Sequence, residues 1–92
     1  MIYDLICRYL DAGQEISEPA VSATNLSECS TLARAFILNN ELEAGEWIAG
    51  DVYIGDGLIA KLAYNGRAIC QIVFQIASLY FGDFIRNWAI VV

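Results

Sequence analysis

The sequence predicts an α+β fold: one helix packed on a four- to five-stranded antiparallel sheet, with an apolar C-terminal extension. Two dipeptides, Asp56-Gly57 and Asn65-Gly66, separate three β-rich runs between residues 48 and 74. Such dipeptides favour the positive-φ turns of tight hairpins, so we expect a three-stranded meander there. A helix-capping pattern upstream, followed by an apolar stripe, predicts the helix that covers the meander. With 92 residues, the chain is expected to form a single domain, 1–92.

The register of the meander sorts its side chains into two faces, because successive residues of a strand point to opposite sides. If both loops have two residues, the expected core face has one charged member, Lys61, and otherwise consists of Val52, Ile54, Ile59, Ala63, Ala68, Cys70, Ile72 and Phe74. The second face is expected to carry Asp51, Tyr53, Leu58, Ala60, Leu62, Tyr64, Arg67, Ile69, Gln71 and Val73. This second face is too apolar to be fully solvated, so we expect it to be partly covered.

The N-terminal segment, residues 2–10, fits either a strand or a helix by periodicity. We favour the strand, because the segment is rich in aromatic and β-branched residues and the next segment needs a neighbour to pair with. Residues 15–24 are expected to form an irregular edge strand, since Pro19 removes one donor from the ladder. Its better-formed part is expected at residues 20–24.

The helix is predicted over residues 26–39. Asn25 fits the N-cap and Glu28, three residues on, completes a capping box. An apolar stripe at helical spacing follows, made of Leu26, Cys29, Leu32, Ala33, Phe36 and Ile37. This stripe is the natural cover for the apolar face of the meander.

The C-terminal segment, residues 75–92, holds three aromatic residues within a short stretch, Phe81, Phe84 and Trp88. Their spacing is helical, whereas the last five residues are more typical of a strand. In either form, the segment is expected to be buried on the second sheet face or against another chain.

Composition restricts the class of protein. Eleven acidic and five basic residues give a net charge of −6, and the basic residues are scattered. Such a charge repels nucleic acid and anionic membranes, so neither is expected as a partner. Three widely spaced cysteines favour a reducing compartment. No signal peptide or membrane-spanning run is expected, and we place the protein in the cytoplasm.

The sequence offers no recognisable catalytic, cofactor or metal site. Histidine is absent, which removes the usual nucleophile-activating base and the commonest metal ligand. No Cys-x-x-Cys pair and no phosphate-binding loop occurs. Asp51 and Arg67 fall on the same predicted face and are expected to form a charge contact rather than an acid–base pair. We therefore expect a non-enzymatic protein without cofactor or metal.

A protein–protein interface is the leading functional hypothesis, because aromatic residues are enriched at interface cores. Residues expected to bind the partner are Tyr53, Leu62, Tyr64, Ile69 and Trp88, together with the acidic residues Glu41, Glu43 and Glu46. Each aromatic residue also fits a purely structural role, and the acidic segment also fits a solvated loop. A homodimer that buries the second face is expected. Two alternatives stay open: a self-associating structural module or toxin–antitoxin partner, and a small enzyme or ligand-binding domain.

The order of elements resembles that of some small phage-encoded anti-CRISPR proteins. The likeness covers residues 2–74 and includes the Asn25-Leu26-Ser27-Glu28 helix start and the two Gly-containing turns. The resemblance is architectural, and the apolar segment after Phe74 departs from it. It implies a short, acidic, non-enzymatic inhibitor that occupies a surface of a host defence complex, and it assigns no binding residue.

Overall fold

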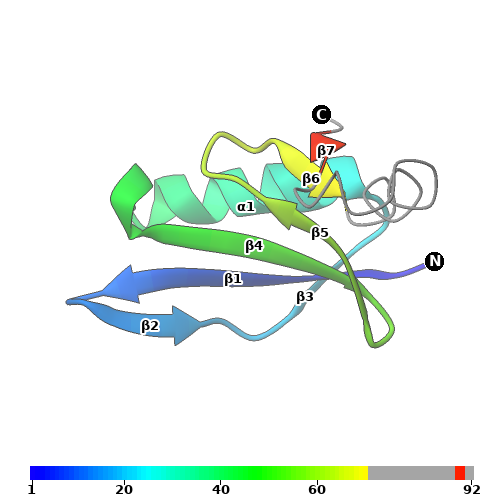
Figure 1. Ribbon diagram of the computed structural model, residues 1–92, viewed down its shortest axis with the longest axis horizontal. Coiled ribbons are helices and arrows are strands. Elements are labelled where there is room, and N and C mark those ends of the chain that lie inside the picture. The colour runs from blue at the N-terminus through cyan, green and yellow to red at the C-terminus, as the bar shows by residue number, and fades with distance from the viewer. Residues whose placement is uncertain (71–88, 91–92) are drawn as a thin grey trace, which may run out of the picture.

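The computed structural model describes residues 1–70 and the backbone of residues 89–90. The described elements, in chain order, are β1 (Tyr3–Asp11), β2 (Gln14–Ser17), β3 (Val21–Ala23), α1 (Leu26–Asn39), the 3-10 helix η1 (Ala44–Glu46), β4 (Trp47–Ile54), β5 (Gly57–Leu62), β6 (Ala68–Cys70) and β7 (Ala89–Ile90). The sheet is antiparallel with the order β2-β1-β4-β5-β6-β7, and β3 also pairs with β1 (Figure 1). The predicted α+β fold, one helix on an antiparallel sheet, is confirmed.

The N-terminal segment is a strand, as favoured from the sequence, and β1 lies inside the sheet. Residues 4–9 pair with β4 on one side. On its other side, β1 pairs with β3 near its start and with β2 near its end. The edge strand predicted over 15–24 is therefore interrupted around Pro19, and the half before the proline is as regular as the half after it. The Glu18 amide still reaches β1, donating to the Cys7 carbonyl at 2.9 Å.

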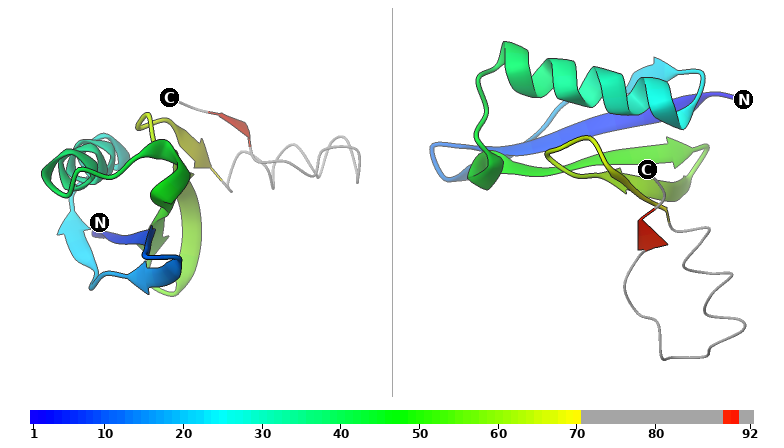
Figure 2. Two further views of the ribbon diagram at one scale, coloured as in Figure 1. Left: turned by 90° about the vertical axis from the view of Figure 1, so that its left-hand side faces the viewer. Right: turned by 90° about the horizontal axis from the view of Figure 1, so that it is seen from above.

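Helix α1 begins and ends where the sequence predicts. Its N-cap is Asn25, whose side-chain oxygen accepts from the Glu28 amide at 2.7 Å. Cys29, Ala33 and Ile37 are buried along one side of the helix. They meet a core that includes Leu5, Val52 and Leu62. Figure 2 shows the helix lying along one side of the sheet, which curves around it.

The first hairpin of the meander differs from the prediction by its turn and by a bulge. Ile54 pairs with Gly57, so the turn residues are Gly55 and Asp56 rather than Asp56 and Gly57. Moving away from the turn, Tyr53 pairs with Leu58 but Val52 pairs with Ala60. Ile59 is therefore an extra residue, a β-bulge, and the parity between β4 and β5 changes there.

The second hairpin has a loop one residue longer than predicted. The Gly66 amide donates to the Ala63 carbonyl and the Ala63 amide to the Arg67 carbonyl, both at 2.9 Å. This encloses a three-residue loop, 64–66, in which Gly66 has φ +89, the usual form for a loop of this length. Consequently Leu62 pairs with Ala68 and Lys61 with Ile69.

The bulge and the longer loop together invert only the second half of β5. A change of one residue in register moves the side chains that follow it to the other face. Leu58, before the bulge, still shares a face with Tyr53 as predicted. The bulge at Ile59 inverts residues 60–62, and the extra loop residue restores β6. Val52 and Ala68 are therefore in the core, as predicted. Ala60 and Leu62 are also buried there, and the prediction that they lie on the second face is wrong. Lys61, predicted on the core face, lies on the opposite one.

Candidate functional site

The sheet face turned away from α1 carries the residues of the candidate site, and we call it the outer face. Ladder pairing places Ile6 opposite Asp51, Asp51 opposite Lys61, and Lys61 opposite Ile69. These residues alternate with core residues such as Leu5, Val52 and Leu62, so they point away from the helix. The described outer face includes Asp4, Ile6, Arg8, Asp51, Tyr53, Leu58, Lys61 and Ile69.

An ion-pair network joins three strands on this face. Arg8 Nη1 donates to Asp51 Oδ2 at 2.9 Å, and Arg8 Nη2 donates to Glu15 Oε1 at 3.0 Å. The hydrogen bond to Asp51, followed by the one to Glu15, raises the pKa of the Arg8 guanidinium above its usual value. The two carboxylates therefore lie beside a permanently charged cation. The network also ties β2 and β4 to the strand between them.

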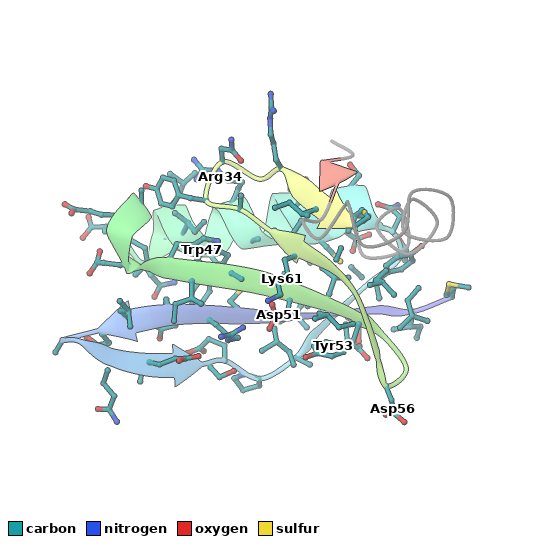
Figure 3. The ribbon with its side chains drawn as sticks, in the orientation of Figure 1. Arg34, Trp47, Asp51, Tyr53, Asp56 and Lys61 are labelled. Atoms are coloured by element: carbon teal, nitrogen blue, oxygen red, sulfur yellow. The ribbon has the colours of Figure 1, made fainter. Side chains whose placement is uncertain are left out.

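Asp51 is the only buried charged residue among those that the structure describes, at 5% exposure. Its Oδ2 is paired with Arg8, but its Oδ1 has no hydrogen-bond partner within the described part of the chain. Figure 3 shows Asp51 beside Lys61 on the face turned to the viewer. A buried carboxylate costs free energy unless it is paired, so this position depends on its cationic neighbour.

A cleft opens on the outer face beside the tip of the β4–β5 hairpin. Its volume is about 280 Å³, and its lining residues are Asp4, Ile6, Ala20, Tyr53, Gly55 and Asp56. Asp4 and Tyr53 are direct ladder partners, which places a carboxylate beside an aromatic ring. The Asp4 carboxylate accepts one exposed hydrogen bond, from Ser22 Oγ at 3.3 Å. The cleft thus combines two carboxylates with apolar walls.

The structure places two predicted partner-binding residues on the outer face, as expected. Tyr53 lines the cleft and is half-buried. Ile69 pairs with Lys61 and is also half-buried. Trp88, and the predicted second-face residues Gln71 and Val73, lie outside the described residues, as do the predicted core positions Ile72 and Phe74.

Leu62 does not lie on the outer face, contrary to the prediction. It is 1% exposed and packs in the core, because the second half of β5 is inverted. Its main-chain carbonyl also accepts a hydrogen bond from Trp47 Nε1 at 3.0 Å. Leu62 is therefore a structural residue.

Tyr64 was also predicted on the second face, and this placement is wrong. It belongs to the loop between β5 and β6 and packs against the core beside α1. Its hydroxyl donates to the Leu42 carbonyl at 2.9 Å. The Arg34 guanidinium lies over its ring at 5.2 Å and donates to its main-chain carbonyl at 2.6 Å. Tyr64 therefore links the loop to the helix.

The acidic segment after α1 is partly structural. Glu46 Oε1 accepts a hydrogen bond from the Glu43 amide at 2.8 Å, across the short helix η1. Glu41 follows the helix end with φ +52, and both Glu41 and Glu43 are exposed. These residues lie at the end of β4 opposite to the Gly55-Asp56 turn, so they do not share a site with the cleft.

Sequence reasoning missed Arg8, Asp4 and Asp56, and it paired Asp51 with the wrong arginine. Arg67 is exposed in the β5–β6 loop, whereas Asp51 pairs with Arg8. The alternation of charged Asp4 and Arg8 with buried Leu5 and Cys7 was a usable signal for a polar face of β1. The strand that lies beside β1 could not be predicted, because no local pattern in the sequence shows that β1 pairs with β4.

The cysteines are poorly suited to nucleophilic chemistry. Burial, with a smaller effect of the Glu18 charge, raises the pKa of the Cys7 thiol to about 11. Burial also raises the pKa values of Cys29 and Cys70. All three are free thiols. Because the thiolate is the reactive form, they are weak nucleophiles at neutral pH.

Comparison with known proteins adds no family. No protein-family model matches the chain, and neither the curated proteins nor the solved structures contain a significant match. Among the described residues, no group of three or more acidic, cysteine or histidine side chains is placed to hold a metal ion. Within the same residues, no helix is long and apolar enough to cross a membrane.

Proposed function

We propose that the protein is a non-enzymatic binding protein that recognises another protein through its outer face. The observation that carries this proposal is the cleft beside Tyr53, which lies on the side of the sheet turned away from α1. Half-buried Ile6, Tyr53 and Ile69 provide apolar area on that face, and the Arg8–Asp51 pair fixes the strands beneath it. A rigid surface with apolar side chains and charged neighbours suits protein recognition.

The acidic composition and the carboxylates of the cleft favour a partner with a basic surface, because complementary charge speeds encounter and fixes orientation. The narrower idea, an inhibitor of a CRISPR-type host defence complex, is supported only by the architectural resemblance. The free thiols support a reducing compartment, and we propose the cytoplasm.

The experiment is a pull-down with the full chain from a host-cell lysate, analysed by mass spectrometry. Wild type is compared with Tyr53→Glu, which places a charge in the outer face. The matched control is Leu38→Glu, because Leu38 is 65% exposed on the helix. We expect wild type and Leu38→Glu to retain the same stoichiometric partner and Tyr53→Glu to lose it. Identification of that partner as a subunit of a defence complex would support the narrower idea.

Two other results would contradict the proposal. Retention of the partner by Tyr53→Glu would place the interface elsewhere on the molecule. Recovery of no partner, together with a thermal shift on adding a metabolite, would favour a small enzyme or ligand-binding domain. A single cognate toxin as partner would instead favour the toxin–antitoxin alternative.

A further inference from the structure

We propose that the cleft on the outer face is a socket for one cationic side chain, a lysine or arginine presented by the protein partner. This inference rests on the proposed function, since it names the group by which the partner is anchored. It is carried by the cleft's size, by the charge of its lining and by the position of Tyr53.

The size of the cleft fits a single long side chain. The cleft measures about 280 Å³, at the lower end of the about 300–1,000 Å³ usual for small-molecule pockets, and Gly55 and Asp56 of the turn are among its lining residues. An open site of this size accepts a chain that enters from outside. A lysine or arginine side chain has that form, with an apolar stem and a charged end.

The lining matches both parts of such a side chain. Ile6 and the ring of Tyr53 offer apolar contact to the methylene stem, which long basic side chains bury readily. The Tyr53 ring can also attract a cation placed over its face. Asp4 and Asp56 supply two carboxylates for the charged end.

The described surroundings leave these two carboxylates available. Asp56 makes no hydrogen bond or ion pair with the described residues, and Asp4 accepts only the bond from Ser22. Arg8, on the same strand as Asp4, is already engaged by Asp51 and Glu15. A metal ion is a poorer fit than an organic cation, because two carboxylates give too few ligands for a dedicated site.

A direct titration tests the socket without knowledge of the partner. The probes are N-acetyl-arginine amide and N-acetyl-lysine amide, with N-acetyl-citrulline amide as the neutral isostere of the first. Binding is followed on the full chain by ¹⁵N-¹H NMR. We expect shifts confined to the cleft, at the amides of Tyr53, Gly55 and Asp56, with the cationic probes and not with citrulline. Added salt should weaken them.

Variants then separate the socket from general acidity. Asp4→Asn with Asp56→Asn should weaken binding of the cationic probes at least about tenfold, which corresponds to about 1.4 kcal/mol. The control, Asp11→Asn with Glu41→Gln, removes two charges from exposed positions outside the cleft and should bind like wild type. Tyr53→Leu keeps an apolar wall without the ring and should bind more weakly than wild type. The dispersed amide spectrum of each variant verifies that it is folded.

The inference is overturned if citrulline gives the same shifts, if the cationic probes give none, or if both double variants weaken binding equally. Its failure is distinguishable from failure of the proposed function. Should the pull-down yield a partner that the Asp4→Asn, Asp56→Asn variant retains in full, the binding function stands and the socket is wrong. Should Tyr53→Glu also retain that partner, the proposal that the partner binds the outer face is wrong.

Discussion

The guanidinium of Arg34 covers the ring of Tyr64 at 5.2 Å and donates a 2.6 Å hydrogen bond to the main-chain carbonyl of the same residue. One turn earlier on the helix, Ser30 Oγ donates to the Gly66 carbonyl at 2.6 Å. These contacts attach the β5–β6 loop to the helix. The loop lies so close to the helix that a Cβ atom on Gly66 would be 3.0 Å from Ser30 Oγ.

Three glycine-to-alanine substitutions should separate backbone strain from this close contact. Gly45 has ordinary backbone and open space around it, Gly13 has φ +81 and open space, and Gly66 has φ +89 and the helix beside it. We expect Gly45→Ala to change the free energy of unfolding by less than about 0.5 kcal/mol. Gly13→Ala should cost about 1–2 kcal/mol through its left-handed backbone. Gly66→Ala should cost at least about 1 kcal/mol more, because it also crowds the helix.

Urea unfolding followed by circular dichroism measures the three values. Equal losses for Gly13→Ala and Gly66→Ala would show that the helix moves away from the loop without cost.

The Arg8–Asp51 pair should behave as a coupled unit. Arg8→Met leaves Asp51 buried without its cation, and we expect a loss of about 2–4 kcal/mol. Adding Asp51→Leu should recover part of this loss, because the unpaired buried carboxylate is then gone. Glu15→Gln, which removes only the exposed partner, should cost less than about 1 kcal/mol.

A double-mutant cycle on urea unfolding gives the coupling energy of Arg8 and Asp51. Additive losses in the Arg8→Met, Asp51→Leu double variant would mean that the two side chains stabilise the sheet independently.

Stability should fall in alkali through Cys7. In the folded state the pKa of its thiol is about 11, above the ordinary value of 9.0 that we take for the unfolded chain. Between these values the unfolded chain binds fewer protons than the folded one, so its population grows as pH rises. Wild type should therefore lose roughly 1 kcal/mol more than Cys7→Ala between pH 8 and pH 10.

Urea unfolding at the two pH values measures this difference. Parallel losses in the two proteins would mean that Cys7 ionises as easily in the fold as in the unfolded chain. The comparison is made as a difference because burial also raises the pKa values of Cys29 and Cys70 in both proteins.

The homodimer predicted from the sequence would bury Tyr53 and cover the cleft, so it competes with the proposed partner for the outer face. If the dimer forms, light scattering of wild type gives twice the monomer mass and Tyr53→Glu gives a folded monomer, because an unpaired carboxylate in a buried interface is costly. Tyr64→Glu should instead destabilise the fold itself, since Tyr64 packs between α1 and the loop. A wild-type monomer at high micromolar concentration would refute the dimer.

Local signals in the sequence were sufficient to predict the helix and the strands, but not to assign every strand residue to the correct face of the sheet. The Asn25 cap, the helical stripe and the break at Pro19 each depend on neighbouring residues, and the structure has all three. The hairpins were also located correctly. Residues 60–62 of their shared strand were assigned to the wrong faces because a bulge occurs at Ile59, and β6 was nevertheless assigned correctly because the second loop has one residue more than assumed. No local pattern in the sequence specifies those differences of one residue.

The candidate site was predicted only in part for the same reason. Tyr53 and Ile69 lie on strands whose faces were assigned correctly, whereas Leu62 lies in the inverted half of β5 and Tyr64 in the longer loop. Arg8 and Asp4 could not be joined to Asp51 and Tyr53 from the sequence. Their proximity depends on the pairing of β1 with β4, which are separated along the chain by the helix.

The bulge makes the positions of β5 unequal under deletion. Ile59 has no ladder partner on β4, so removal of its codon would let Leu58 and Ala60 follow one another in a regular ladder with every partner unchanged. Removal of the Ala60 codon would also leave a regular ladder, but it would place the larger Ile59 side chain in the fully buried position of Ala60 opposite Val52, where the core has to make room for it. In genetic terms, the gene should tolerate an in-frame loss of one residue at 59 better than the same loss at 60.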